Sequence, residues 1–151
     1  MAYAREKDGY RLSDDPELLD QEAIYAYLRR SYWANTRQPH TQLIANRNSL
    51  CFGVYHDAAQ VGFARVVTDH ATFAYLADVY IDDAHQGRGL GKWLVQSVQS
   101  HPRLQGLRRW ALATRDAHEL YVQSGWQPLK NTERWMEIYD GNANPPLATA
   151  P

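Results

Sequence analysis

Cysteine is nearly absent from the 151-residue chain, whose single thiol is Cys51. One cysteine forms no internal disulfide, and no Cys/His spacing typical of zinc accompanies it, so we expect no metal and a reducing compartment. A signal peptide and an apolar run of about twenty residues are lacking too, which favours a cytoplasmic protein without a membrane span. Cys51 lies in a short apolar run and is predicted to be a buried strand residue rather than a nucleophile.

An excess of either charge is also missing, since 16 Lys and Arg residues stand against 17 Asp and Glu residues. The basic residues are scattered, so neither nucleic acid nor an anionic membrane is an expected partner. The apolar content of 44% suffices for one core at this length. We expect a single domain over residues 1–140 and a disordered, proline-containing tail over residues 141–151.

The hydrophobic pattern predicts strands and helices in alternation, without an internal repeat. Ser13-Asp14-Asp15-Pro16 is a strong helix start, because short polar side chains cap free amides and proline suits the first turn. Helices are expected from this start to about residue 32 and over residues 40–46, 89–100 and 117–124. Strands are expected over residues 10–12, 49–56, 60–68, 73–81, 108–113 and 134–139.

The run from Val79 to Lys92 is the most informative part of the chain, because an apolar strand there meets a glycine-rich turn and an amphipathic helix. The first amides of such a helix lack an intrahelical acceptor and, with the helix dipole, favour a bound anion. Glycines at 87, 89 and 91 permit positive φ and a close approach of the backbone to phosphate.

Two common phosphate-binding loops do not fit this run. Trp93 follows Lys92, so the Gly-Lys-Ser/Thr of a nucleoside-triphosphate loop and its magnesium-binding hydroxyl are absent. The glycines also miss the Gly-x-Gly-x-x-Gly of a dinucleotide fold, and residues 106–110 offer no acid about twenty positions later. Kinase, ATPase and dinucleotide-dependent functions are therefore disfavoured.

Two other motifs stand in order along the chain. The first fits Gln/Arg-x-x-Gly-x-Gly/Ala and reads Gln86-Gly87-Arg88-Gly89-Leu90-Gly91. The second, residues 117–126, is similar to Ala-x-x-x-Tyr-x-x-x-Gly-Phe, with Trp126 for the usual Phe. On these motifs, which span the core at about residues 49–140, the chain resembles the GNAT superfamily of acyl-CoA N-acyltransferases. The resemblance implies an α/β (α+β) fold with a mixed, mostly antiparallel sheet of six to seven strands, splayed at its centre and flanked by about four helices.

The resemblance also implies acetyl-CoA as co-substrate, without a metal. Strand residues would hold the pantetheine arm, and amides of the glycine loop would hold the pyrophosphate. Thr114 stands where the superfamily often has an asparagine that contacts the cofactor arm. Arg88 is either a phosphate contact or a solvated cation, and Gln86 is expected to brace the loop. The implied cofactor-binding residues are Val79, Tyr80, Ile81, Gln86, Gly87, Arg88, Gly89, Leu90, Gly91, Lys92 and Thr114.

Two residues are candidates for the chemistry. Tyr121 stands at the superfamily's proton-donor position, and a phenol of pKa about 10 can protonate a departing thiolate of pKa about 8 to 9; the alternative is packing. Asp78 lies among apolar residues on the strand that should flank the reacting carbonyl. Such a carboxylate binds an ammonium substrate, accepts its proton, or forms a structural salt bridge. A backbone amide at Val79 or Tyr80 is the expected oxyanion donor.

Acceptor binding is expected at the end of the first helical region and on the neighbouring strand. Aromatic side chains beside Asp78 suit a cationic amine, whereas Arg37 suits a carboxylate. The expected acceptor-binding residues are Tyr32, Trp33, Arg37 and Tyr75. The hypothesis is an N-acetyltransferase that acts on a small-molecule primary amine by direct attack in a ternary complex. The resemblance implies a homodimer as one of the oligomeric states open to the chain. The alternatives are a protein-lysine or N-terminal acetyltransferase and a non-catalytic acyl-CoA-binding module.

Overall fold

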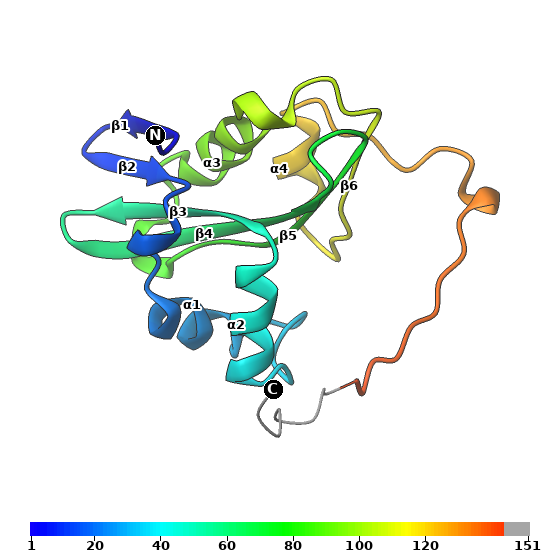
Figure 1. Cartoon of the computed structure of the whole chain (residues 1–151), viewed down its shortest axis with the longest axis horizontal. Helices are drawn as coiled ribbons and strands as arrows, with labels where there is room; N and C mark the ends of the chain where they lie inside the picture. The colour runs from blue at the N-terminus through cyan, green and yellow to red at the C-terminus, as the bar shows by residue number, and fades with distance from the viewer. Residues whose placement is uncertain (144–151) are drawn as a thin grey trace.

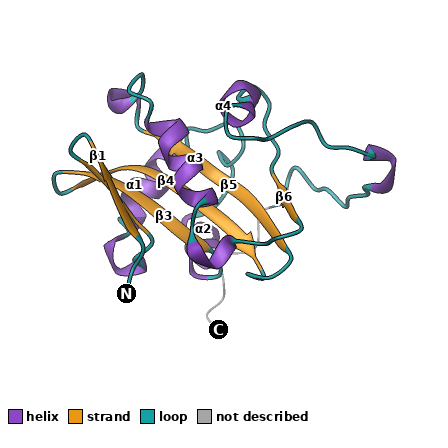
Figure 2. Cartoon of the chain, turned by 90° about the horizontal axis from the view of Figure 1, so that it is seen from above, coloured by secondary structure: helices purple, strands orange, loops and turns teal. Residues whose placement is uncertain are grey.

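The computed structural model describes residues 1–143 and contains one six-stranded sheet over that range, in which chain order and spatial order are the same. Neighbouring strands are antiparallel except for the last two, which are parallel. Figure 1 and Figure 2 show the strands side by side. The strands are β1 (Ala4–Lys7), β2 (Tyr10–Ser13), β3 (Leu50–His56), β4 (Ala59–Thr68), β5 (Phe73–Ile81) and β6 (Arg109–Ala111).

Helices cover both faces of the sheet, with α1 and α2 below it and α3 and α4 above it in Figure 1. On the α3 side, Leu94 and Val98 are fully buried in a cluster with Phe52, as the apolar spacing of that helix requires. On the α1 side, Ile24 and Leu28 are buried in a second cluster. The helices are α1 (Gln21–Leu28), α2 (Pro39–Arg47), α3 (Leu90–Gln99) and α4 (His118–Val122).

The first helical region differs from the single long helix predicted after Ser13. Ser13 ends β2, and Asp15 caps only a 3-10 turn over Pro16–Leu18 by accepting from the Glu17 amide. The α-helix begins later, where the side chain of Asp20 accepts from the amide of Ala23. Two capping residues therefore follow each other in this region, and each begins a short helical element of its own.

The strand predicted over residues 134–139 is wrong. Within residues 1–143 that segment joins no sheet, and a 3-10 turn (Thr132–Arg134) occupies its beginning. The segment is rich in apolar and aromatic side chains, but a strand also needs a neighbour for its backbone groups. The sequence also missed β1, which is paired with β2 and carries polar, mostly exposed side chains. Most of the predicted tail, residues 144–151, lies outside the described residues.

Candidate active site

A β-bulge in β5 creates the site. Phe63 of β4 pairs with Tyr80, whereas Arg65 pairs with Ala77, so Asp78 and Val79 share one place in the ladder. Asp78 has φ 54°, in the left-handed region, which re-aims the strand. On its other side, β5 pairs with β6 only from Phe73 to Tyr75. The two strands then part, as expected for a sheet that is splayed at its centre. The second half of β5 has no strand on that side within the described range.

A groove of about 570 Å³ lies between the bulged end of β5, the glycine loop and α4. Gly87 and Gly89 both have positive φ, and Gly89 precedes α3 without a side chain that could cap it. The first amides of α3 are therefore available to an anion. This glycine-loop groove is lined by eight of the predicted cofactor residues: Val79, Tyr80, Ile81, Gln86, Gly87, Gly89, Leu90 and Gly91.

Gln86 has a second role at the edge of this groove, and the other three predicted cofactor residues, Arg88, Lys92 and Thr114, do not line it. Gln86 donates from its side chain to the Ile81 carbonyl at 2.9 Å and so ties the loop to β5. Arg88 and Lys92 are not among the side chains that line the groove. Thr114 accepts from the Ala117 amide at 3.0 Å and lines the neighbouring pocket instead. Lys7 was missed by the sequence analysis, since only the β1 to α3 packing brings its Nζ to 3.7 Å from the position of a Cβ on Gly89.

A second cavity of about 390 Å³ adjoins this groove at the bulge. It is formed by the loop between α1 and α2, the middle of β4 and β5, and the segment before α4. All four predicted acceptor-binding residues line it. We call it the Asp78 pocket, and its polar and aromatic lining comprises Tyr32, Trp33, Arg37, Arg65, Tyr75, Asp78, Thr114, Arg115, Asp116 and Tyr121.

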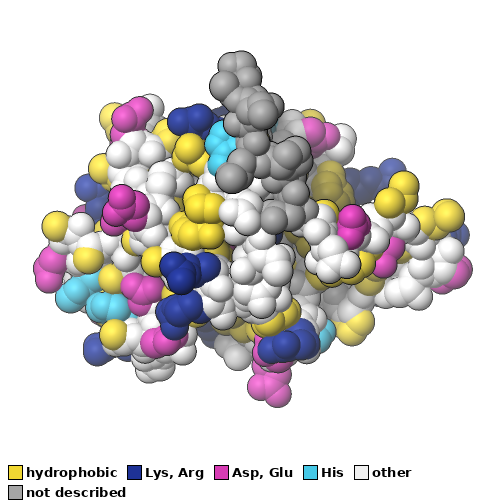
Figure 3. Space-filling view, turned by 90° about the horizontal axis from the view of Figure 1, so that it is seen from below, with side chains coloured by type: hydrophobic (Ala, Val, Ile, Leu, Met, Phe, Trp, Pro, Cys, Tyr) yellow, Lys and Arg dark blue, Asp and Glu magenta, His cyan; other side chains and the backbone are white. Residues whose placement is uncertain are grey.

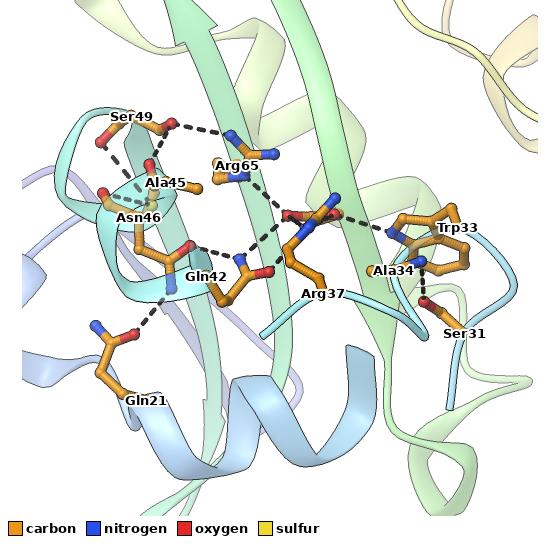
Figure 4. Close-up of polar contacts among 12 residues, drawn as sticks. Gln21, Ser31, Trp33, Ala34, Arg37, Gln42, Ala45, Asn46, Ser49 and Arg65 are labelled. Atoms are coloured by element: carbon orange, nitrogen blue, oxygen red, sulfur yellow. Dashed lines mark hydrogen bonds and ion pairs between the residues drawn. The ribbon is translucent and has the colours of Figure 1, made fainter. Parts of the chain in front are cut away.

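Asp78 is 4% exposed, and four side chains that Figure 4 labels, those of Trp33, Arg37, Gln42 and Arg65, donate to its carboxylate. Arg65 donates from Nε at 2.8 Å and Arg37 from Nη1 at 2.9 Å. Trp33 donates from its indole at 2.9 Å, and Gln42 from its amide at 3.2 Å. Burial acts to raise the pKa of this carboxyl, but the charges of Arg65 and Arg37 and the hydrogen bonds outweigh it and lower the pKa. Asp78 is therefore an ionised member of a salt-bridge cluster, and its lone pairs are engaged.

A further arginine closes the outer side of the pocket. The guanidinium of Arg115 lies 3.8 Å from the ring centroid of Tyr32, and the Arg115 amide donates to the Tyr32 hydroxyl at 2.9 Å. One face of the Tyr32 ring, which a cationic substrate could use, is thus covered by a cation of the chain itself.

Tyr121 stands between the two cavities. Together with Val79 it lines both the glycine-loop groove and the Asp78 pocket. Its side chain is 9% exposed and packs edge-on against Trp126, with ring centroids 5.9 Å apart. Burial raises the pKa of Tyr121 to about 12, with a smaller contribution from Tyr32. The phenol therefore keeps its proton at neutral pH and can donate it or a hydrogen bond.

Other kinds of site have little support among residues 1–143. No group of three or more His, Cys, Asp or Glu side chains is placed to hold a metal ion there. In the same part of the chain, no helix is both long and apolar enough to cross a membrane. Cys51 is buried in the α1-side cluster, and burial raises its thiol pKa to about 12.

The bulged strand, the glycine loop and Tyr121 form an arrangement suited to a group-transfer enzyme, and comparison with known proteins shows which family the chain belongs to. The model of the acetyltransferase (GNAT) family matches residues 16–126. A candidate acetyltransferase of Gibberella zeae is 37% identical over an alignment of 135 residues that covers 74% of this chain and 75% of that protein. The chain belongs to the GNAT family and is an acyltransferase.

Solved structures show the same fold. A candidate GNAT acetyltransferase from Xanthomonas campestris pv. campestris superposes with a TM-score of 0.87 and 43% identity, over 91% of this chain and 97% of that one. A candidate acetyltransferase from Clostridium acetobutylicum, solved with acetyl-CoA, has a TM-score of 0.56 and 12% identity, over 86% and 94% of the two chains. The predicted family and fold are thus confirmed, and acetyl-CoA is the acetyl donor of this family.

Proposed function

We propose that the protein is an acetyl-CoA-dependent N-acetyltransferase that acetylates a primary amine of a small molecule by direct attack in a ternary complex. One observation carries the proposal: Val79 and Tyr121 line both cavities. A thioester in the glycine-loop groove and an amine in the Asp78 pocket would therefore meet at the bulge, beside the Tyr121 phenol.

The residues at this junction suit each step of aminolysis. The neutral amine forms a C–N bond at the thioester carbonyl, and the bulge leaves an amide of Val79 or Tyr80 free to stabilise the oxyanion. When the C–S bond breaks, the thiolate takes a proton from the Tyr121 hydroxyl. The ammonium proton of the product leaves through solvent in the open pocket, and Tyr121 regains its proton by the same route.

Direct attack is favoured because the chain offers no acyl-accepting thiol at this junction. The pKa of the Cys51 thiol is raised to about 12 by burial, and the residue lies in the cluster that packs on α1. A thiol that is neither ionised nor beside the groove cannot serve as a relay for the acetyl group.

The charges of the Asp78 pocket favour an acceptor that carries an anionic group as well as its amine. Three arginines, Arg37, Arg65 and Arg115, stand against two carboxylates, Asp78 and Asp116. Asp78 is already paired with two of those arginines, and the face of Tyr32 is covered by the third. An amino acid or a similar amino-carboxylate would use the remaining positive charge.

A screen of acetyl-CoA consumption tests this function with matched pairs of acceptors, an amino acid and its decarboxylated amine. We expect free thiol to appear with small amines, and kcat/KM to be about tenfold higher for the carboxylate-bearing member, which corresponds to about 1.4 kcal/mol. Intact mass after incubation with acetyl-CoA alone should show no acetylated enzyme. Turnover confined to lysine peptides would identify a protein acetyltransferase, and binding of acetyl-CoA without any turnover would identify a binding module.

The glycine loop supplies a separate prediction about acetyl-CoA binding. In Gly89→Ala the positive φ of 77° is strained by about 1–2 kcal/mol, and the loop relaxes by moving its amides. We expect the Kd for acetyl-CoA, measured by calorimetry, to rise about tenfold. Gly106→Ala is the matched control, because Gly106 has φ 76° and open space around it but lies outside the groove. Equal losses of affinity in the two variants would exclude the loop as the diphosphate site.

A further inference from the structure

The ammonium group of an acceptor needs a carboxylate that is free to receive it. A primary amine with a pKa of about 10 arrives as an ammonium ion at neutral pH. Figure 3 shows the face that carries α1 and α2, where acidic and basic side chains are mixed, so this face offers no broad field that would guide a cation. Inside the pocket, the Asp78 carboxylate already accepts hydrogen bonds from four side chains. Another group must therefore bind the ammonium ion.

Asp116 lies where the amine and the thioester would meet. Four residues line both the Asp78 pocket and the glycine-loop groove, and they are Val79, Asp116, Ala117 and Tyr121. Asp116 is the only one of the four with a carboxyl group. A carboxylate at this junction can face a nitrogen that approaches the thioester carbon.

Within residues 1–143, the structure gives this carboxylate no other task. Asp116 stands just before α4 but does not cap it, since α4 has no side-chain cap and the Ala117 amide donates to the Thr114 hydroxyl at 3.0 Å. Its one ion pair in this range is with Arg115, at 3.5 Å from Oδ2 to Nη2, and the two side chains are 62% and 65% exposed. Such an exposed pair contributes little stability. The Asp116 oxygens therefore remain open to a second cation.

Arg115 lies farther from the thioester than Asp116 does. It lines the Asp78 pocket and a third cavity of about 600 Å³, here called the outer cavity, which the end of α1 and the segment before α4 enclose. It does not line the glycine-loop groove. Stacking on the Tyr32 ring fixes the guanidinium in place and leaves the N–H groups at its edge available to a carboxylate. Two consecutive residues thus present opposite charges, and only the negative one reaches the groove.

We propose that Asp116 binds the ammonium group of the acceptor and that Arg115 binds its carboxylate, so that an amino acid enters with its amine toward the thioester. This inference rests on the proposed function and adds the orientation of the acceptor to it. Both contacts are charge-assisted hydrogen bonds. The exposed pair between Arg115 and Asp116 opens at little cost when the zwitterion inserts between its two charges.

The loss of either contact should act on KM more than on kcat. The acceptor nitrogen is positive as the bound ammonium and again when the C–N bond has formed, so Asp116 stabilises both states alike. In Asp116→Asn, KM should rise about tenfold for an amino acid and for its decarboxylated amine, and kcat should change by less than about threefold. In Arg115→Gln, KM should rise about tenfold for the amino acid alone, because the decarboxylated amine has no group for Arg115 to bind.

Initial rates measure these constants with the amino acid and amine pair that the wild type turns over fastest in the acetyl-CoA screen. Glu119→Gln is the matched control, because Glu119 is an exposed acid in the first turn of the same helix but lines none of the three cavities. It should behave as the wild type does. Inhibition by the corresponding α-hydroxy acid gives a readout without an amine. Its Ki should be unchanged in Asp116→Asn and should rise in Arg115→Gln.

Three results would overturn the proposal while wild-type turnover leaves the acetyltransferase function standing. The first is an equal KM in the wild type and Asp116→Asn. The second is an equal rise in Glu119→Gln, which would indicate a general effect of charge near α4. The third is a matching rise in the Ki of the hydroxy acid in Asp116→Asn, which would indicate a distorted pocket. A wild type that acetylates no amine at all would overturn the function and this proposal together.

Discussion

Replacing Tyr121 by Phe is expected to lower kcat by about 100-fold or more, because the ring and its packing on Trp126 remain while the proton donor is lost. The Kd for acetyl-CoA should change little, since the proposed diphosphate site is the glycine loop. Steady-state kinetics and calorimetry measure the two quantities. Tyr25→Phe on α1 is the matched control, because Tyr25 lines neither cavity. Full turnover by Tyr121→Phe at every pH would remove the residue from the chemistry.

The pH profile of the wild type distinguishes a donor from a base at this position. Burial raises the pKa of Tyr121 to about 12, so its proton is present throughout the range in which the enzyme is stable. We expect kcat/KM to rise with pH as the acceptor amine loses its proton, and to show no fall up to about pH 10. The departing thiolate, with a solution pKa of about 8.5, is a weaker base than the Tyr121 phenolate, so the phenol gives up its proton only as the C–S bond breaks and regains one from solvent as the ammonium proton is released.

Asp78→Asn is expected to cost about 3–5 kcal/mol of unfolding free energy, because it leaves Arg37 and Arg65 without their buried counter-charge. Asn fits the left-handed backbone at this position, so the loss of stability comes from the removed charge and not from backbone strain. Urea unfolding at neutral pH measures it. Asp83→Asn is the control, since the Arg30 to Asp83 pair has side chains 59% and 70% exposed and should change stability by less than about 1 kcal/mol.

The difference in unfolding free energy between wild type and Asp78→Asn should become smaller as the pH falls. The pKa of Asp78 is lower in the folded state than in the unfolded chain, whose value is about 3.9. Its stabilising contribution is therefore complete above that value and is lost as the pH falls through the folded pKa. The two proteins should converge at acid pH. A constant difference, or equal stability at neutral pH, would show that the cluster does not stabilise the fold.

The sequence predicted the parts of the site that lie close together in the chain. β5, the glycine loop and the start of α3 are contiguous, so apolar pattern and glycine spacing indicated them without knowledge of the fold. Tyr121 followed from the second motif. The partners of Asp78 could not be assigned in the same way, because Arg37 and Arg65 lie 41 and 13 residues away and reach it only through the bulge.

The segments near the two ends of the chain show a different limit of prediction from sequence. β1 has polar, mostly exposed side chains, so its pairing with β2 left no hydrophobic signal. Residues 134–139 have the apolar and aromatic side chains typical of a strand, but they join no strand within the described residues. A pattern indicates which residues suit a sheet, whereas the neighbour that completes the sheet is a property of the folded or assembled molecule.

The bulge at Asp78 separates what can be redesigned in this enzyme from what must be kept. The kink that opens β5 at the proposed thioester site is the same one that seats the carboxylate between Arg37 and Arg65. Libraries aimed at new acceptors should therefore hold these three residues and Trp33, which donates to Asp78, constant and diversify Tyr32, which is 41% exposed. Changes there alter the mouth of the site at little cost to folding, so that acceptor range can evolve while the acetyl-transfer centre is inherited intact.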